Sequence, residues 1–242
     1  MKNKKIRILI SGGDGNLSTH IQSQNTEYEL YAPSKKEMDI KNIKDIKRAI
    51  SHFSPHYFLH CAALTRPMVI HETDPKLSVE TNIIGTANIS ALCIEHEIKL
   101  IYISTDYVYP GTKGDYKEND NLNPFTNYGW SKLGGECSVR LCPKHLILRV
   151  AMNEKPFPHP RALIDMKKSL VYVDEAAALI LNVLDEEGII NIGGKGQSVF
   201  NFVRESVPAI KGITLKEVKD VNMATDCSLN INKLNKILRY EN

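Results

Sequence analysis

Short apolar runs alternate with amphipathic segments along the first part of the chain. The runs at residues 6–10, 28–32, 57–61 and 100–103 are rich in β-branched and aromatic side chains, as buried strands are. Between them, apolar residues recur with the spacing of one helix face, for example Ile43, Ile46, Ala49, Ile50 and Phe53. Strands that alternate with helices predict an α/β fold with a Rossmann-type doubly wound parallel sheet.

The pattern weakens after residue 150. Three prolines, Pro156, Pro158 and Pro160, predict an extended loop there. The glycines at residues 193–196 predict a turn before a helix that begins near Ser198. We therefore expect a dinucleotide-binding Rossmann domain at residues 1–150. Residues 151–242 should form a small, reduced C-terminal substrate-binding lobe, interleaved with late Rossmann elements.

Composition excludes several classes of protein. The 31 Lys and Arg residues nearly balance the 28 Asp and Glu residues, and no basic stripe with aromatic residues indicates nucleic acid. The five cysteines are scattered, which favours a reducing compartment over disulfides or a metal site. The N-terminal apolar run is far too short for a signal or membrane segment. We expect a cytoplasmic protein that binds no metal and no membrane.

A glycine-rich turn follows the first predicted strand. Gly12, Gly15, Asn16 and Leu17 lie between this strand and a helical segment. Strand, glycine turn and helix in this order can place backbone N–H groups against a pyrophosphate. The alternative is an ordinary turn, but its position at the start of an α/β chain favours a dinucleotide.

The end of the second predicted strand bears on the choice of cofactor. No acidic residue is there to hold a ribose 2′-hydroxyl, and the chain offers Ser34 and Lys35 instead. This hydroxyl and the two ammoniums of Lys35 and the following Lys36 suit a 2′-phosphate, so NADP(H) is favoured and NAD(H) remains possible. The alternative is an exposed basic loop.

Small or polar residues follow the third and fourth predicted strands. Ala62, Ala63 and Thr65 come after one, and Ser104, Thr105 and Asp106 after the other. Ligands of such folds bind at the carboxyl ends of the parallel strands. We expect these segments to meet the glycine turn in one site.

A tyrosine and a lysine then follow at helical spacing. Tyr128 and Lys132 share one helix face, where the ammonium favours the phenolate and lowers the tyrosine pKa. Tyr31 with Lys35 and Tyr109 with Lys113 have the same spacing, so the match also arises by chance. Only Tyr128 follows residues that begin a helix, Thr126 and Asn127. Thr105 could complete a site that polarises a carbonyl.

These segments resemble the extended short-chain dehydrogenase/reductase family, and within it the dTDP-4-dehydrorhamnose reductase group. The most specific blocks of the resemblance are Ser104-Thr105-Asp106-Tyr107-Val108 and Tyr128-Gly-Trp-Ser-Lys132. It also extends to four further segments: Met38-Asp39-Ile40, Thr81-Asn82 and the residues up to Asn88, Val171–Ala176, and Ile190–Gly194. It covers the chain well to Val150 and only in patches afterwards. A longer substrate segment, rich in aromatic residues, and an Arg-Pro pair near the C-terminus are not matched.

The resemblance implies a role for each matching residue. Thr105, Tyr128 and Lys132 would be catalytic, with Tyr128 as the proton donor and Lys132 lowering its pKa and holding the nicotinamide ribose. Gly12, Gly15, Asn16, Leu17, Ser34, Lys35, Asp39, Ile40, Ala62, Ala63, Thr65 and Asn82 would bind the cofactor, and Ser104, Asp106, Tyr107 and Arg149 the substrate. It also implies a homodimer formed through the helix at residues 82–95 and the Tyr128 helix.

The implied reaction is reduction of a nucleotide-activated 4-keto-6-deoxy sugar by NADPH. Related dehydratases carry Asp-Glu where this chain has Asp106-Tyr107, so a reductase is favoured. An epimerase is a further alternative, with Cys142 and His159 as available acid–base types. A different class of function is a non-catalytic NADP-binding subunit, like the regulatory subunit of methionine adenosyltransferase. The intact Thr105, Tyr128 and Lys132 favour the enzyme, and the reduced lobe keeps the binding module open.

Overall fold

The central sheet confirms the predicted parallel α/β architecture. The structure is a computed structural model that describes residues 5–218 and 223–240. Its sheet has the order β10-β5-β4-β3-β1-β2, with every neighbouring pair parallel. The strands are β1 (Arg7–Ser11), β2 (Glu29–Tyr31), β3 (Tyr57–His60), β4 (Lys99–Thr105), β5 (His145–Val150) and β10 (Gly188–Ile192).

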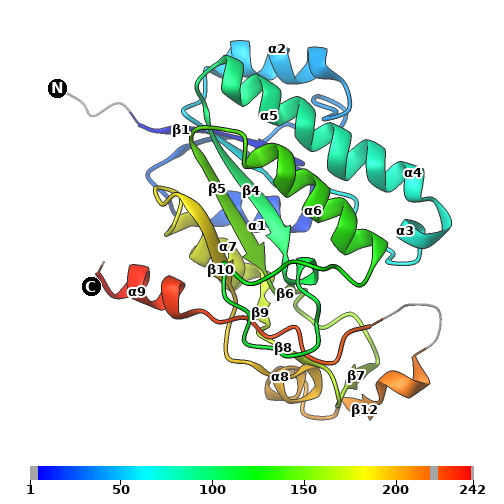
Figure 1. Ribbon diagram of the computed structural model, residues 1–242. Helices are drawn as coiled ribbons and strands as arrows, with labels where there is room; N and C mark the ends of the chain where they lie inside the picture. Colours follow the sequence, from blue (N-terminus) through cyan, green and yellow to red (C-terminus); the bar gives the residue numbers. More distant parts are fainter. Residues whose placement is uncertain (1–4, 219–222, 241–242) are drawn as a thin grey trace.

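Helices cover both faces of this sheet (Figure 1). On one face, α1 (Asn16–Ser23), α7 (Val173–Leu181) and α9 (Asn232–Tyr240) share a core with the strands. On the other, the helices are α2 (Ile43–Phe53), α5 (Gly85–Glu95) and α6 (Asn127–Val139). In β1, Ile8 and Ile10 pack into the first core and Leu9 into the second, because successive side chains of a strand point to opposite faces. A sheet covered on both sides needs the continuous apolar runs of this sequence.

The long helix that follows Asp74 has an irregular centre. It consists of α4 (Pro75–Ser78), a π-helical turn η1 (Val79–Ile84) and α5, and the short α3 (Ile70–Thr73) precedes it. Asp74 caps its start by accepting a hydrogen bond from the Leu77 backbone N–H at 3.2 Å. By length and composition Pro75–Glu95 could span a membrane, but 44% of its most apolar window is buried in the fold. Helices from protein cores have the same composition.

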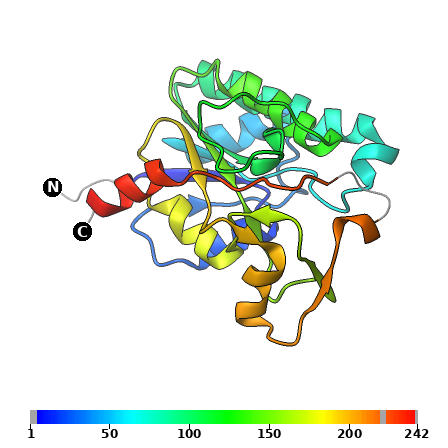
Figure 2. The same ribbon diagram turned by 60° about the horizontal axis from the view of Figure 1, so that its bottom comes forward.

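A small lobe stands at the carboxyl edge of the sheet (Figures 1 and 2). It contains β7 (Arg161–Leu163) paired with β12 (Lys211–Ile213), β8 (Lys167–Lys168) paired with β11 (Gln197–Ser198), and α8 (Val199–Ser206) with the short turn η3 (Leu215–Glu217). The strand β6 (Met152–Asn153) pairs with β9 (Val171–Tyr172) where the lobe leaves the sheet. Ala162, Met166, Val199 and Phe202 belong to a separate core cluster in this lobe.

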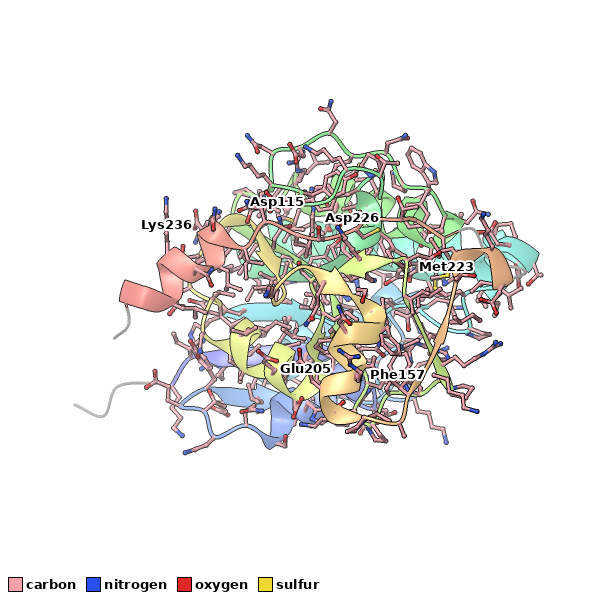
Figure 3. The ribbon with its side chains drawn as sticks, turned by 90° about the horizontal axis from the view of Figure 1, so that it is seen from below. Asp115, Phe157, Glu205, Met223, Asp226 and Lys236 are labelled. Carbon is pink, nitrogen blue, oxygen red and sulfur yellow. The ribbon has the colours of Figure 1, made fainter. Side chains whose placement is uncertain are left out.

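The segment that leads into α9 ties the lobe to the rest of the molecule (Figure 2). Its Asn230 backbone N–H donates to the Tyr116 carbonyl at 2.8 Å. Its Cys227 backbone N–H donates to the Lys167 carbonyl at 2.9 Å. Asp226 belongs to this segment, and Asp115 accepts a hydrogen bond from the Nδ2 of its Asn230 at 3.1 Å; Figure 3 labels both aspartates. The lobe is therefore held in place by the C-terminal part of the chain as well as by its own core.

Candidate active site

A cavity of about 970 Å³ runs between the carboxyl edge of the sheet and the lobe. Its size is at the upper end for small-molecule sites, which reach roughly 1,000 Å³. The sheet side is formed by the segments that the sequence predicted to converge, around Gly12, Ala62, Thr105 and Tyr128. One continuous space thus joins a nucleotide-type loop to the Thr-Tyr-Lys set.

The glycine turn lies where the strand order reverses, between β1 and β3. Gly12 has φ +73°, and a Cβ there would lie 2.9 Å from the Cα of Ala62. Only glycine fits this approach, because another residue would be strained in this conformation and would clash with the backbone of the next strand. In open α/β sheets this crevice is where ligands bind.

The start of α1 is open toward the cavity. Gly15 is its N-cap residue and makes no side-chain capping bond, and Asn16, Leu17 and Ser18 line the cavity. The first N–H groups of a helix have no partner within it and carry a partial positive charge. This geometry fits a pyrophosphate, which would take the place of a capping side chain.

The predicted adenosine end is formed only in part. Lys35, Asp39 and Ile40 line the cavity. Ser34 does not: its hydroxyl donates to the Glu37 carboxylate at 2.7 Å, and its N–H donates to the same oxygen at 2.8 Å. Ser34 therefore closes a tight turn and is corrected from a phosphate ligand to a structural residue. Lys35 is the cation that this loop presents.

Asn82 is also corrected from a cofactor ligand to a supporting residue. It is 1% exposed, and its Oδ1 accepts a hydrogen bond from the Leu64 N–H at 2.8 Å while its Nδ2 donates to the Leu64 carbonyl at 2.9 Å. Nδ2 also donates to the Ser131 hydroxyl at 2.9 Å. The side chain thus fixes the loop that presents Ala62, Ala63 and Thr65 and ties it to α6. Asn82 lies in a π-helical turn, and such turns frequently occur near functional sites.

The predicted catalytic residues lie together. Thr126 caps α6 by accepting the Gly129 N–H at 3.0 Å, so Tyr128 and Lys132 begin a regular helix and both line the cavity. Thr105 is the last residue of β4 and lies across from them. Thr105 is placed to donate a hydrogen bond to the Tyr128 oxygen, an interaction that lowers the pKa of Tyr128. The strand and the helix that follows it therefore bring the three groups to one point.

The expected lowering of the Tyr128 pKa by Lys132 is not seen. Burial raises the pKa of Tyr128 to about 12, although the hydrogen bond with Thr105 opposes the shift. Asp106 and Tyr107 raise the pKa of Tyr128 further and Lys168 lowers it, and Lys132 is not among the groups that act on it. The Lys132 ammonium lies instead 4.2 Å from the centre of the Tyr102 ring. Tyr128 is thus a protonated phenol at neutral pH, the form that can donate a proton.

Lys132 is a buried cation without an ion-pair partner among the described residues. It is 3% exposed, and burial lowers its pKa to about 7, with Glu136 only partly opposing the shift. Glu136 is occupied by Arg149, whose Nη2 lies 2.8 Å from its Oε2. A bound group with hydroxyls or negative charge would be a strong partner for this ammonium.

Arg149, predicted to bind substrate, is corrected to a core residue. It is fully buried and does not line the cavity. Besides Glu136, its guanidinium donates to the Tyr109 hydroxyl at 2.8 Å and to the Glu118 carbonyl at 3.0 Å. Ser104 does line the cavity, but its hydroxyl donates to Glu136 at 2.6 Å. Both residues therefore support the walls of the site.

Asp106 and Tyr107 meet a residue that the sequence did not indicate, Lys168. The Lys168 Nζ lies 2.9 Å from the Asp106 Oδ2 and 4.1 Å from the centre of the Tyr107 ring. Burial lowers the pKa of Lys168, but the Asp106 carboxylate outweighs it and raises the pKa above its ordinary value. No motif distinguishes Lys168 from its neighbour Lys167, so sequence could not have found it.

The rest of the lobe side is largely apolar. The lining residues that the sequence missed here include Met152, Phe157, Leu163, Met166, Leu170, Val199, Ile213 and Met223, and His159 lines the cavity as well. Phe157 and Met223, which come from different segments of the lobe, are labelled in Figure 3. Cys142, weighed with His159 as an acid–base pair, is buried elsewhere beside the Ser90 carbonyl. The two do not form a pair.

Solved structures share the overall fold. A dTDP-4-dehydrorhamnose reductase of Bacillus anthracis in complex with NADP superimposes with a TM-score of 0.88 at 25% identity, over 96% of this chain and 93% of that one. The UDP-glucose 4-epimerase of Thermus thermophilus in complex with NAD gives 0.79 at 19% identity, over 98% and 93%. The second likeness shows the fold alone.

Curated relatives match a little over half of the chain. A dTDP-4-dehydrorhamnose reductase of Aggregatibacter actinomycetemcomitans is 33% identical over 150 residues, 60% of this chain and 51% of the relative. Methionine adenosyltransferase 2 subunit beta of Xenopus laevis is 32% identical over 142 residues, 55% and 42%. The matched part spans about half the length of these relatives. Residues 6–153, more than half of the chain, match the RmlD substrate binding domain, and the protein belongs to that family.

Proposed function

We propose that the protein is an NADPH-dependent reductase of a nucleotide-activated 4-keto-6-deoxy sugar, serving the synthesis of surface glycans. The observation that carries the proposal is the single cavity in which Thr105, Tyr128 and Lys132 face the glycine turn and the open start of α1. The family supports an oxidoreductase, and the Bacillus anthracis neighbour was solved with NADP.

Different residues of the chain would bind different parts of the cofactor. The start of α1 would hold the pyrophosphate, Asp39 and Ile40 the adenine, and Lys35 a 2′-phosphate, because all of them line the same end of the cavity. Ala62 and Ala63 leave room for the cofactor beside the backbone of β3. Lys132 would hold the nicotinamide ribose. When bound, the nicotinamide supplies the hydride.

Tyr128 then acts as the general acid. Its pKa of about 12 keeps the phenol protonated at neutral pH, so it can donate its proton to the substrate oxygen as the carbonyl is reduced. Thr105 would donate a second hydrogen bond to this oxygen and stabilise the charge that develops there. Ordered donors at one oxygen are what a ketone reductase requires.

The test is loss of NADPH absorbance with dTDP-, GDP- and UDP-linked 4-keto-6-deoxy sugars, each freshly generated. Turnover with one of them would establish the reaction and the nucleotide. Tyr128→Phe should then lose about a thousand-fold in kcat, because a positioned general acid contributes roughly 10²–10⁴-fold. NADPH binding by this variant should be unchanged. Turnover by Tyr128→Phe at the wild-type rate would contradict the proposed role.

A second candidate is a non-catalytic subunit that uses the fold to bind NADP and a partner protein. It is favoured by the match to methionine adenosyltransferase 2 subunit beta, which is as strong as the match to the reductase. Tight NADPH binding without turnover of any of the three substrates would support it. In that case Tyr128→Phe should leave partner binding intact.

A further inference from the structure

A buried ion pair joins the lobe to the catalytic strand. Lys168 comes from β8 in the lobe, and Asp106 follows Thr105 directly at the end of β4. Asp106 is 2% exposed and the side chain of Lys168 12%, and their charged atoms lie 2.9 Å apart. Removing two charges from water costs several kcal/mol per ion, so a buried pair is weak evidence of a purely stabilising role. Both residues line the cavity.

The pair is connected to Tyr128 through Thr105. The Thr105 hydroxyl donates to the Asp106 Oδ1 at 3.1 Å and accepts the Tyr107 backbone N–H at 3.2 Å. Thr105 and Tyr128 line the same cavity, and Thr105 is placed to donate to the Tyr128 oxygen, which lowers the pKa of Tyr128. The Tyr107 and Tyr128 ring centres lie 6.0 Å apart. The polar groups therefore form a chain from Lys168 through Asp106 and Thr105 to the phenol.

This chain creates a competition for one proton. The Thr105 hydroxyl has a single proton, and an uncompensated carboxylate accepts it more strongly than a ketone oxygen does. An uncompensated carboxylate next to the phenol would also make it a weaker acid. An ammonium on the far oxygen of Asp106 reduces both effects.

We propose that Lys168 is a positioning residue for this site: its ammonium holds and neutralises Asp106, which leaves the Thr105 hydroxyl and the Tyr128 proton available to the substrate oxygen. The role in turnover rests on the proposed reductase function. The lobe, in this view, completes the proton-donating group as well as enclosing the substrate.

The groups around Tyr128 define what a pH measurement would report. Asp106, Lys168 and Tyr107 shift the pKa of Tyr128, and Cys227 lies near the ion pair. The His71 ring centre is 5.0 Å from the Tyr128 ring centre, and Lys132 is one turn along α6. Variants confined to Lys168 and Asp106 change only the pair and leave the other groups in place.

The first experiment measures steady-state NADPH consumption with the nucleotide sugar that the wild-type protein turns over. Lys168→Met should lower kcat about tenfold to a hundredfold and leave the KM for NADPH unchanged, because the cofactor end is untouched. Lys168→Arg should retain most of the activity. Lys168→Met with Asp106→Asn should recover part of the loss, since no buried charge is left unpaired. Lys167→Met is the matched control, because this neighbour is exposed and does not line the cavity.

A second experiment needs no turnover. Carbon NMR of ring-labelled tyrosine, with the Tyr128 signal assigned from Tyr128→Phe, would follow the titration of the phenol. Asp106→Asn should move this titration down by about one pH unit, and Lys168→Met should move it up, with the double variant between. If Lys168 had only a structural role, Lys168→Met would lower activity, but the Tyr128 titrations of the three variants would not follow this order.

The outcomes separate the two proposals. If the wild-type protein reduces none of the sugars, the proposed function fails, and the Tyr128 titration still decides the role of Lys168. An unchanged Tyr128 titration in all three variants would overturn the proposal. So would a double variant whose kcat is as low as that of Lys168→Met.

Discussion

Two buried lysines flank Tyr128, and their surroundings give them opposite properties. Lys132, on the cofactor side, lies over the Tyr102 ring, and burial lowers its pKa to about 7. Lys168, on the lobe side, is paired with Asp106, and the carboxylate outweighs burial and raises its pKa. The residue type is the same and both are removed from water. Glu136 near Lys132 only partly opposes the effect of burial, whereas the carboxylate in direct contact with Lys168 outweighs it.

The difference also divides the cavity by function. The unpaired ammonium of Lys132 gains from a ligand that brings hydroxyls or negative charge, which suits binding. The paired ammonium of Lys168 is already compensated and acts on its neighbours. Arg149 is ion-paired like Lys168, but it is fully buried, faces the core and serves stability.

The largest expected effect is a difference in sign between two matched substitutions. Near about pH 6, Lys168→Met should lower the free energy of unfolding by about 3 kcal/mol, because it leaves the buried Asp106 carboxylate unpaired. Lys132→Met should raise it by about 2 kcal/mol, because it removes a buried charge that has no partner. Urea unfolding measures both. Destabilisation of equal size by the two substitutions would show that the lysines are equivalent.

The pH dependence of stability sharpens the same comparison. An unfolded lysine titrates near about 10.4, and folded Lys132 near about 7. Between these values the unfolded state binds more protons, so the Lys132 contribution to stability rises by about 1.4 kcal/mol per pH unit.

The measurement is the difference in unfolding free energy between the wild type and Lys132→Met from about pH 7 to about pH 9.5. The upper limit matters because the raised pKa of Tyr128 acts in the opposite direction above about pH 10, the ordinary value for tyrosine. A difference that does not vary with pH would mean that Lys132 keeps its proton throughout this range.

Substitution of Asn82 tests whether this residue supports the loop that presents Ala62 and Ala63 to the cofactor. Asn82→Ala leaves the buried N–H and carbonyl of Leu64 without partners, and we expect a loss of about 1–3 kcal/mol in unfolding free energy. NADPH affinity should fall, because Ala62 and Ala63 are no longer held. Fluorescence titration of NADPH measures it. Asn191→Ala, which removes hydrogen bonds to the Tyr116 and Asn230 carbonyls, is a control outside the cavity.

The smallest expected effect concerns a third lysine, Lys35, which is exposed. Lys35→Ala should weaken NADPH binding about tenfold and leave NADH binding unchanged, because only NADPH carries a 2′-phosphate. A tenfold change in the dissociation constant corresponds to about 1.4 kcal/mol of binding free energy. Lys36→Ala is the matched control, since Lys36 does not line the cavity. Equal loss for both cofactors would remove Lys35 from the phosphate site.

Much of the scaffold follows from local sequence. The strands β1 to β4 were predicted because β-branched and aromatic runs of this length bury both faces of a sheet, and β4 begins one residue earlier than expected and ends two residues later, at Thr105. The strands β5 and β10, which complete the sheet, were not among the predicted runs. The meeting of Gly12, Ala62, Thr105 and Tyr128 follows from topology, since the carboxyl ends of parallel strands share one edge. The four-residue spacing of Tyr128 and Lys132 needed only the helix that Thr126 caps.

What the sequence could not determine depends on partners far along the chain. Asn82 is fixed by the backbone of Leu64, Arg149 by Glu136 and Tyr109, and Lys168 by Asp106. Lys167 and Lys168 read alike, yet one faces solvent and the other the active site, because the pairing of β8 with β11 sets which side chain points inward. Sequence by itself determined the sheet and where its ligand edge lies. The tertiary structure decided which polar residues face that edge, since the cost of burying a charge depends on the group that folding brings beside it.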